Sequence, residues 1–141
     1  MEVRLARNAA EIERALDLRI EVFCGEQGVD VSAERDADDD RALHFVAVDD
    51  GRVVGTCRVI MDGGLARLGR MVVERSRRGT GLGAELLAVA ERAARDGGAG
   101  RVRLHAQVGA REFYARGGYE ARGEPFVEEG IDHITMERAL A

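Results

Sequence analysis

A short glycine-rich stretch between a predicted strand and the clearest predicted helix constrains the fold most. It is Arg78-Gly79-Thr80-Gly81-Leu82-Gly83-Ala84, with three glycines in five positions. Apolar residues then recur at helical spacing from Leu82, and Asp96-Gly97-Gly98 ends the pattern. The segment before the glycines, residues 65–73, is typical of a strand. This order presents backbone N–H groups at a helix N-terminus, which favours an anion site and most simply a pyrophosphate.

This stretch lacks residues that two known nucleotide-binding motifs require. Gly79, Gly81 and Ala84 satisfy the dinucleotide fingerprint, but that motif needs a carboxylate at the end of the next strand to hold the ribose. The next predicted strand, residues 101–106, ends without an acid. A P-loop needs a lysine, and the chain has none. An NAD-dependent oxidoreductase is therefore disfavoured, and a flexible loop without a ligand stays as the structural alternative.

A family resemblance follows from the spacing of these residues. Arg78-x-x-Gly81-x-Gly83 resembles the Arg/Gln-x-x-Gly-x-Gly/Ala signature of GNAT N-acetyltransferases, in which the loop holds the pyrophosphate of coenzyme A. Downstream residues are similar to the family's Asn-x-x-Ala-x-x-Phe/Leu-Tyr segment. From residue 18 to 140 the chain resembles the ElaA-like branch. The matching segments are Phe23-x-x-Glu26-Gln27, Asp38-Asp39-Asp40, His44, Ala106-Gln107, Ala110-x-x-Phe113-Tyr114, Gly117-Gly118-Tyr119 and Glu124-Pro125-Phe126-x-Glu128-x-Gly130-Ile131-x-His133.

Length and composition set limits on the class of protein. A chain of 141 residues that is 45% hydrophobic is predicted to form one domain, residues 1–141. The net charge of −5 disfavours nucleic acid as a partner. Two cysteines, Cys24 and Cys57, give neither a disulfide framework nor a metal-ligand spacing, so no metal is expected. Without a signal-peptide core or a long apolar run, we expect a cytoplasmic protein that does not enter a membrane.

The order of predicted elements indicates an α/β fold with a mixed sheet. A first short strand precedes a helix that Asn8 caps, and residues 29–41 are a loop or a frayed helix. Asp-Gly and Gly-Gly turns then link three strands, which predicts antiparallel hairpins. The crossover helix between residues 73 and 102 requires a parallel pair. The remaining predictions are a strand at 101–106, a helix at about 108–116, and strands near 119–122 and 133–138. The GNAT resemblance implies that the parallel pair splays and holds the acyl thioester in the gap.

The resemblance also implies the residues that contact acetyl-CoA. Tyr114 stands at the family position of the general acid that protonates the leaving thiolate, although helical spacing would equally make it an aromatic residue facing the sheet. Backbone N–H groups around Met71 and Val73 would bind the coenzyme and polarise the acyl carbonyl. The expected cofactor contacts are Met71, Val72, Val73, Arg78, Gly79, Thr80, Gly81, Leu82, Gly83, Ala84, Gln107 and Tyr114.

The acceptor side is less well defined by the sequence. An amine with a pKa near 10.4 is neutral in only about one molecule in several thousand at pH 7, so a base is expected. Glu26 is one candidate and His44, of a type that titrates near neutral pH, is another. Glu26 could instead end a helix, and His44 could be a sheet residue. His105 is expected to be structural. The acidic residues 34–40 would favour a cationic amine if they border the cleft, and as a solvated loop they would carry no information on the acceptor. The predicted substrate-binding residues are Phe23, Glu26, Gln27, His44 and His133, with Glu128 also near the pocket.

The sequence therefore predicts an acetyl-CoA-dependent N-acetyltransferase for a primary amine, on a small molecule or a peptide. A competing hypothesis is a non-catalytic module that binds acyl-CoA and senses it or regulates a partner. The acceptor and the oligomeric state stay open, a homodimer being possible.

Overall fold

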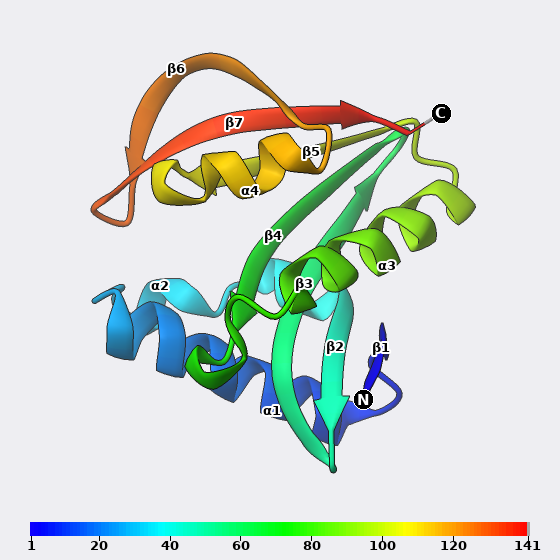
Figure 1. Cartoon of the computed structure of the whole chain (residues 1–141), viewed down its shortest axis with the longest axis vertical. Helices are drawn as coiled ribbons and strands as arrows, with labels where there is room; N and C mark the ends of the chain where they lie inside the picture. Colours follow the sequence, from blue (N-terminus) through cyan, green and yellow to red (C-terminus); the bar gives the residue numbers. More distant parts are fainter. Residues whose placement is uncertain (141) are drawn as a thin grey trace.

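A single twisted sheet organises the chain. The computed structural model describes residues 1–140, and in it seven strands lie in the order β1-β2-β3-β4-β5-β7-β6 (Figure 1). The only parallel neighbours within these residues are β4 and β5; every other pair is antiparallel. The predicted mixed α/β sheet is confirmed. The strands are β1 (Glu2–Leu5), β2 (Leu43–Asp49), β3 (Arg52–Asp62), β4 (Leu65–Val73), β5 (Arg101–Gln107), β6 (Glu120–Glu128) and β7 (Ile131–Ala139).

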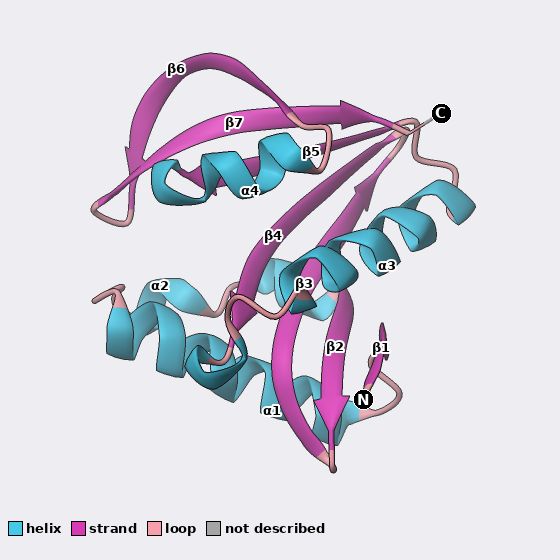
Figure 2. Ribbon diagram, in the orientation of Figure 1, coloured by secondary structure: helices cyan, strands magenta, loops and turns pink. Residues whose placement is uncertain are grey.

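Helices cover the sheet on two sides (Figure 2). The α1 helix (Ala9–Arg19) begins at the predicted cap, where the backbone N–H of Glu11 donates to Asn8 Oδ1 at 2.9 Å, and it continues as the π-helix η1 (Ile20–Glu26). The crossover helix α3 (Leu82–Asp96) packs against the opposite face and forms the main core with the strands. The remaining helices are α2 (Val31–Glu34), α4 (Arg111–Arg116) and the 3-10 turns η2 (Ala37–Asp40), η3 (Arg75–Arg77) and η4 (Val108–Ala110).

The parallel pair opens part-way along its length. Pairing of β4 with β5 runs from Leu65↔Arg101 to Leu68↔Leu104 and then ends, and the two strands diverge (Figure 1). Opposite this point the β3–β4 register shifts, and Arg70 has a φ of 53°, so β4 bulges there. Residues 69–73 of β4 therefore have no ladder partner on the side that faces β5. The splay implied by the resemblance is present.

The strands β5, β7 and β6 have one covered and one open face. Side chains alternate along a strand, so Leu104 and Ala106 enter the core while His105 and Gln107 point to the other face. On β7, Ile134 is in the core and its neighbour His133 lies on the open face. The helices α3 and α4 pack on the core side. The opening between β4 and β5 therefore continues onto a surface of polar side chains.

One prediction about local structure is refined and one needs correction. Residues 29–41, predicted as a loop or a frayed helix, contain the short helices α2 and η2, and Glu34 among them is 1% exposed rather than solvated. The last two strands are longer than predicted, because β6 continues past an irregular stretch between Arg122 and Phe126 that carries Pro125. Within residues 1–140, no helix is long and apolar enough to span a membrane.

Candidate active site

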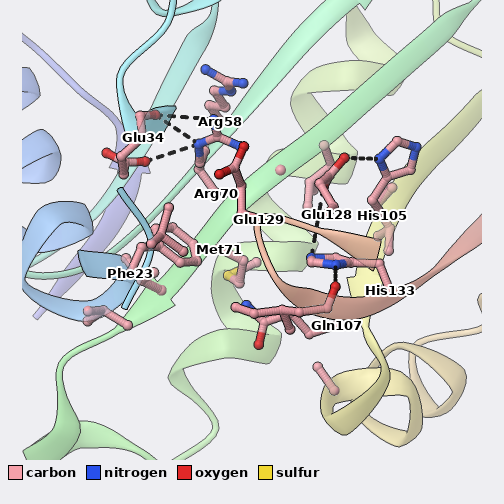
Figure 3. Close-up of a pocket in the computed structure, with 18 of the residues that line it drawn as sticks. Phe23, Glu34, Arg58, Arg70, Met71, His105, Gln107, Glu128, Glu129 and His133 are labelled. Carbon is pink, nitrogen blue, oxygen red and sulfur yellow. Dashed lines mark hydrogen bonds and ion pairs between the residues drawn. The ribbon is translucent and has the colours of Figure 1, made fainter. Parts of the chain in front are cut away.

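A cleft of about 650 Å³ lies where β4 and β5 diverge. One side is formed by residues 69–73 of β4 and by Arg78 of the glycine loop, and Tyr114 of α4 lines it next to Phe113. The other side is formed by α2, η2 and the turn between β6 and β7. Figure 3 shows side chains from these separate segments converging on the cleft. The splay thus brings together residues that are up to about a hundred positions apart in the sequence.

The glycine loop has the backbone geometry that its sequence predicts. Gly79 and Gly81 have φ values of 77° and 88°, which other residues rarely adopt. Gly81 also caps α3, so no side chain satisfies the first N–H groups of that helix. Gly83 serves packing, because a Cβ there would lie 3.2 Å from the Phe113 ring. The Thr80 hydroxyl donates to the carbonyl of Arg77 at 2.5 Å and closes the loop.

The arginine of the signature is engaged by a carboxylate. Arg78 donates to both carboxylate oxygens of Glu26, at 2.9 and 3.1 Å, and Arg75 donates to the same group at 3.3 Å. The hydrogen bonds from Arg78 lower the pKa of Glu26 below its ordinary value. A lowered pKa makes a carboxylate a weaker base, and Glu26 does not line the cleft. The structure therefore places Glu26 with the glycine loop rather than at the acceptor end predicted for it.

Other predicted residues divide between the cleft and its surroundings. Phe23, Gln27, Met71, Val73 and Gln107 line it, and the Gln107 amide donates to Gln27 Oε1 at 2.8 Å across the opening. This bond joins the end of β5 to the end of η1. Val72 also borders the cleft, although its side chain packs with Leu18 and Val22 beneath α1.

His44 is placed away from the cleft. It is 4% exposed on β2, and its Nε2 donates to the carbonyl of Asp39 at 2.8 Å. The side chain is not among those that line the cleft. His44 is therefore a buried sheet residue with a backbone partner, which is the alternative given for it above. This position does not fit contact with a substrate.

Tyr114 is buried at the base of the cleft. The ring is 7% exposed and packs edge-on against Phe113 and Tyr119, with centroid distances of 4.9 and 5.9 Å. Burial, with the Cys57 thiol nearby, raises the pKa of Tyr114 above its ordinary value. The hydroxyl therefore keeps its proton across the neutral range, and the same shift makes it a weaker acid than a free tyrosine.

The opposite wall is built from buried ion pairs. Arg19 of α1 is 1% exposed and donates to Glu34 at 3.0 and 3.1 Å and to Asp39 at 2.7 and 3.1 Å. Arg58 of β3 donates to Asp36 at 2.6 Å and to Asp39 at 2.9 Å. These contacts hold α2 and η2 against the sheet. Within the acidic run, Glu34, Asp36 and Asp39 are paired with arginines from α1, β3 and β4. The run borders the cleft through Glu34, Asp36 and Asp38.

Two further side chains that line the cleft, Glu128 and His105, lie on the open face. Glu128 of β6 accepts from His105 Nδ1 at 3.1 Å, and its other oxygen lies 3.8 Å from His133 Nε2 (Figure 3). All three line the cleft. His105 was expected to be structural. The sequence held one signal that His105 would line the cleft: it lies two residues before Gln107, and alternate residues of a strand share a face.

Comparisons with known proteins agree with the fold and the cleft described above. Residues 9–140 match the family model described as an acetyltransferase (GNAT) domain. The chain belongs to the GNAT acetyltransferase family. The N-acetyltransferase YjcF of Bacillus subtilis strain 168, itself uncharacterized, is 36% identical over 96% of this chain and 98% of its own.

Solved structures agree with this assignment. An acyl-CoA N-acyltransferase from Pseudomonas aeruginosa is 31% identical, with a TM-score of 0.88 over 99% of this chain and 100% of its own. Escherichia coli ElaA has a TM-score of 0.86 at 25% identity, over 98% of this chain and 99% of its own. The resemblance derived from the sequence motifs is confirmed at the level of family and fold.

Proposed function

We propose that this acetyltransferase moves an acetyl group from acetyl-CoA to the nitrogen of a primary amine. The observation that carries the proposal is the opening of β4 from β5 beside the glycine loop, with Tyr114 at its base. The acyl-CoA named for the Pseudomonas aeruginosa relative supports a thioester substrate. The acceptor would be a small molecule or a peptide.

The glycine loop and the β4 edge would hold acetyl-CoA. N–H groups at the start of α3 suit a pyrophosphate, because they donate hydrogen bonds at the positive end of the helix dipole. Arg75 and Arg78 share the single carboxylate of Glu26 and so would leave a net positive charge beside these groups. Residues 78–84 are the contacts expected for this role. The unpaired N–H groups of β4 near Met71 and Val73 would donate hydrogen bonds to the pantetheine arm and polarise the acyl carbonyl. Gln107 would bind the arm from β5.

Direct attack by the amine is favoured over an acyl-enzyme. Cys57 is 1% exposed, and burial raises its pKa to about 12. Burial also raises the pKa of Cys24. Because the thiolate is the nucleophilic form of cysteine, neither side chain is activated near neutral pH. The amine nitrogen would then attack the carbonyl carbon itself, and Tyr114 would donate its proton to the sulfur as the C–S bond breaks.

Calorimetry and a thiol-release assay test the proposal. We expect purified protein to bind coenzyme A and acetyl-CoA, and to release free thiol with at least one member of a panel of putrescine, lysine amide, a glycyl dipeptide and an amino sugar. Binding without release for any amine would favour the acyl-CoA sensor. No binding of either coenzyme would contradict the glycine-loop assignment, and tight binding of NAD instead would favour the oxidoreductase.

A further inference from the structure

Glu128 joins two histidines at the acceptor end of the cleft, and each contact has a defined direction. His133 Nδ1 lies 2.7 Å from the carbonyl of Ile131, which only accepts, so Nδ1 carries the proton in the neutral ring. The lone pair is therefore on Nε2. Nε2 faces Glu128 Oε2 at 3.8 Å. That distance is too long for a hydrogen bond between the two and leaves room for one donor group to reach both.

The rest of this cluster fixes its position. Phe126 stacks on His133 at 5.9 Å and meets the edge of His105 at 5.0 Å. His105 Nδ1 donates to Glu128 Oε1 at 3.1 Å, which holds the carboxylate between the two rings. His133 is also the register partner of Gln107, so it lies beside the residue expected to bind the pantetheine arm. The cluster thus stands next to the opening of the sheet.

The cluster and Tyr114 lie on opposite faces of that opening. Tyr114 packs in the core with Ile134, whereas His133 precedes Ile134 on β7 and points to the other face. A thioester held between the strands would then have its sulfur within reach of the acid on one face. Its carbonyl carbon would be open to an amine from the other.

The remaining charged groups near the cluster are largely paired. The far wall presents Arg58 and Arg70 with Glu34 and Asp36, which neutralise one another. Arg103 on β5 is bound to Glu137. Arg67 on β4 and Glu129 at the β6–β7 turn also line the cleft.

Building on the proposed function, we propose that His133 is the general base for the acceptor amine and that Glu128 and His133 together bind the primary ammonium. The ammonium donates one N–H to Glu128 Oε2 and gives a proton to His133 Nε2. The neutral nitrogen forms the C–N bond, and the nitrogen loses its second proton to solvent. The C–S bond breaks, the thiolate takes the Tyr114 proton, Tyr114 regains one from solvent, and His133 releases its proton to solvent. One amide, one thiol and one net proton result.

Nuclear magnetic resonance of the histidine rings tests the cluster without an enzyme assay. The chain has three histidines, so single substitutions assign every ring signal. In Glu128→Gln, we expect the ring signals of His105 and His133 to shift, because both rings lose the carboxylate that faces them. The ring signals of His44, on β2, are expected to stay unchanged. Glu120→Gln, the same change at the other end of β6, is the control. Unchanged His133 ring signals in Glu128→Gln would overturn the cluster.

Kinetics tests the base. We expect His133→Asn to lower kcat/KM at pH 7 by about 100-fold for the amine found in the panel, with acetyl-CoA affinity unchanged. The deficit should shrink as the pH approaches the pKa of the amine, because the substrate then arrives neutral. If the wild type releases thiol and folded His133→Asn has the same kcat/KM, the base role alone is overturned. A wild type that releases none with any amine would overturn the proposed function and the base role together.

Discussion

The two walls of the cleft are held in place by different forces. The glycine-loop wall, residues 69–84 with Tyr114, rests on local backbone geometry and on the apolar core beneath α3. The ion-pair wall, residues 31–40, has few apolar contacts and is fixed by arginines that reach it from α1, β3 and β4. Backbone geometry and apolar packing therefore dominate in one wall, whereas the other depends mainly on ion pairs.

The largest effect should come from breaking the ion-pair wall. Glu34→Ala leaves Arg19 buried with one fewer carboxylate, and we expect the free energy of unfolding to fall by about 3–5 kcal/mol. Urea denaturation measures this. Glu13→Ala removes an exposed ion pair to Arg35 and should cost less than about 1 kcal/mol. Equal losses in the two variants would mean that the buried pairs do not hold this wall.

The acid on the glycine-loop wall should affect catalysis alone. Tyr114→Phe is expected to lower kcat by about 100-fold, with the affinity for coenzyme A unchanged, because only the proton donor is lost. The control is Tyr119→Phe, which removes the hydroxyl that donates to Glu91 at 2.7 Å outside the cleft. Steady-state thiol release measures both. A kcat for Tyr114→Phe equal to that of Tyr119→Phe would argue against the acid role.

Coenzyme binding should depend on the bare backbone of the loop. Gly81→Val adds a branched side chain at a φ of 88°, and we expect affinity for coenzyme A to fall by about 10- to 100-fold, or roughly 1.4–2.8 kcal/mol. Gly63→Val imposes similar strain at a φ of 64° in the turn between β3 and β4, away from the cleft. Calorimetry on both folded variants separates strain from lost binding. Unchanged affinity in Gly81→Val would refute the pyrophosphate site.

Acid should weaken the ion-pair wall. Burial alone would raise the pKa of Asp39, but hydrogen bonds from Arg19, Asp36 N–H and Arg58 outweigh it and lower the pKa well below 3.8. Hydrogen bonds from Arg58 likewise lower the pKa of Asp36. Carboxyls with depressed folded-state pKa values stabilise the protein fully above their unfolded values, and this stability is lost as pH falls through the folded values.

Urea midpoints between pH 6 and pH 3 measure this loss. We expect the urea midpoint of the wild type to decrease once the pH is below about 4. Asp39→Asn should have a lower urea midpoint than the wild type at pH 6, but that midpoint should change less as the pH falls. A variant as sensitive to pH as the wild type would assign the acid response to other groups.

Local patterns predicted much of the glycine-loop wall. The glycines at residues 79, 81 and 83 identified the loop, and the helical spacing from Leu82 gave α3 its observed bounds, Leu82–Asp96. β4 also has its predicted bounds, and the Asn8 cap is present. These features are set by φ preferences, side-chain spacing and capping, which act over a few residues and so can be read from the chain alone.

The charged side of the cleft was decided by tertiary structure. Nothing local shows that Arg19 will be buried with Glu34, or that Glu26 will be bound by Arg78, because these partners lie 15 and 52 positions apart. His105 and Glu128 meet only because β6 and β7 pair beyond Pro125 and bring the turn over the cleft. An ion pair forms wherever the fold brings charges together. The sequence alone therefore determined the family, the sheet and the glycine loop, whereas long-range packing determined which charged side chains line the cleft.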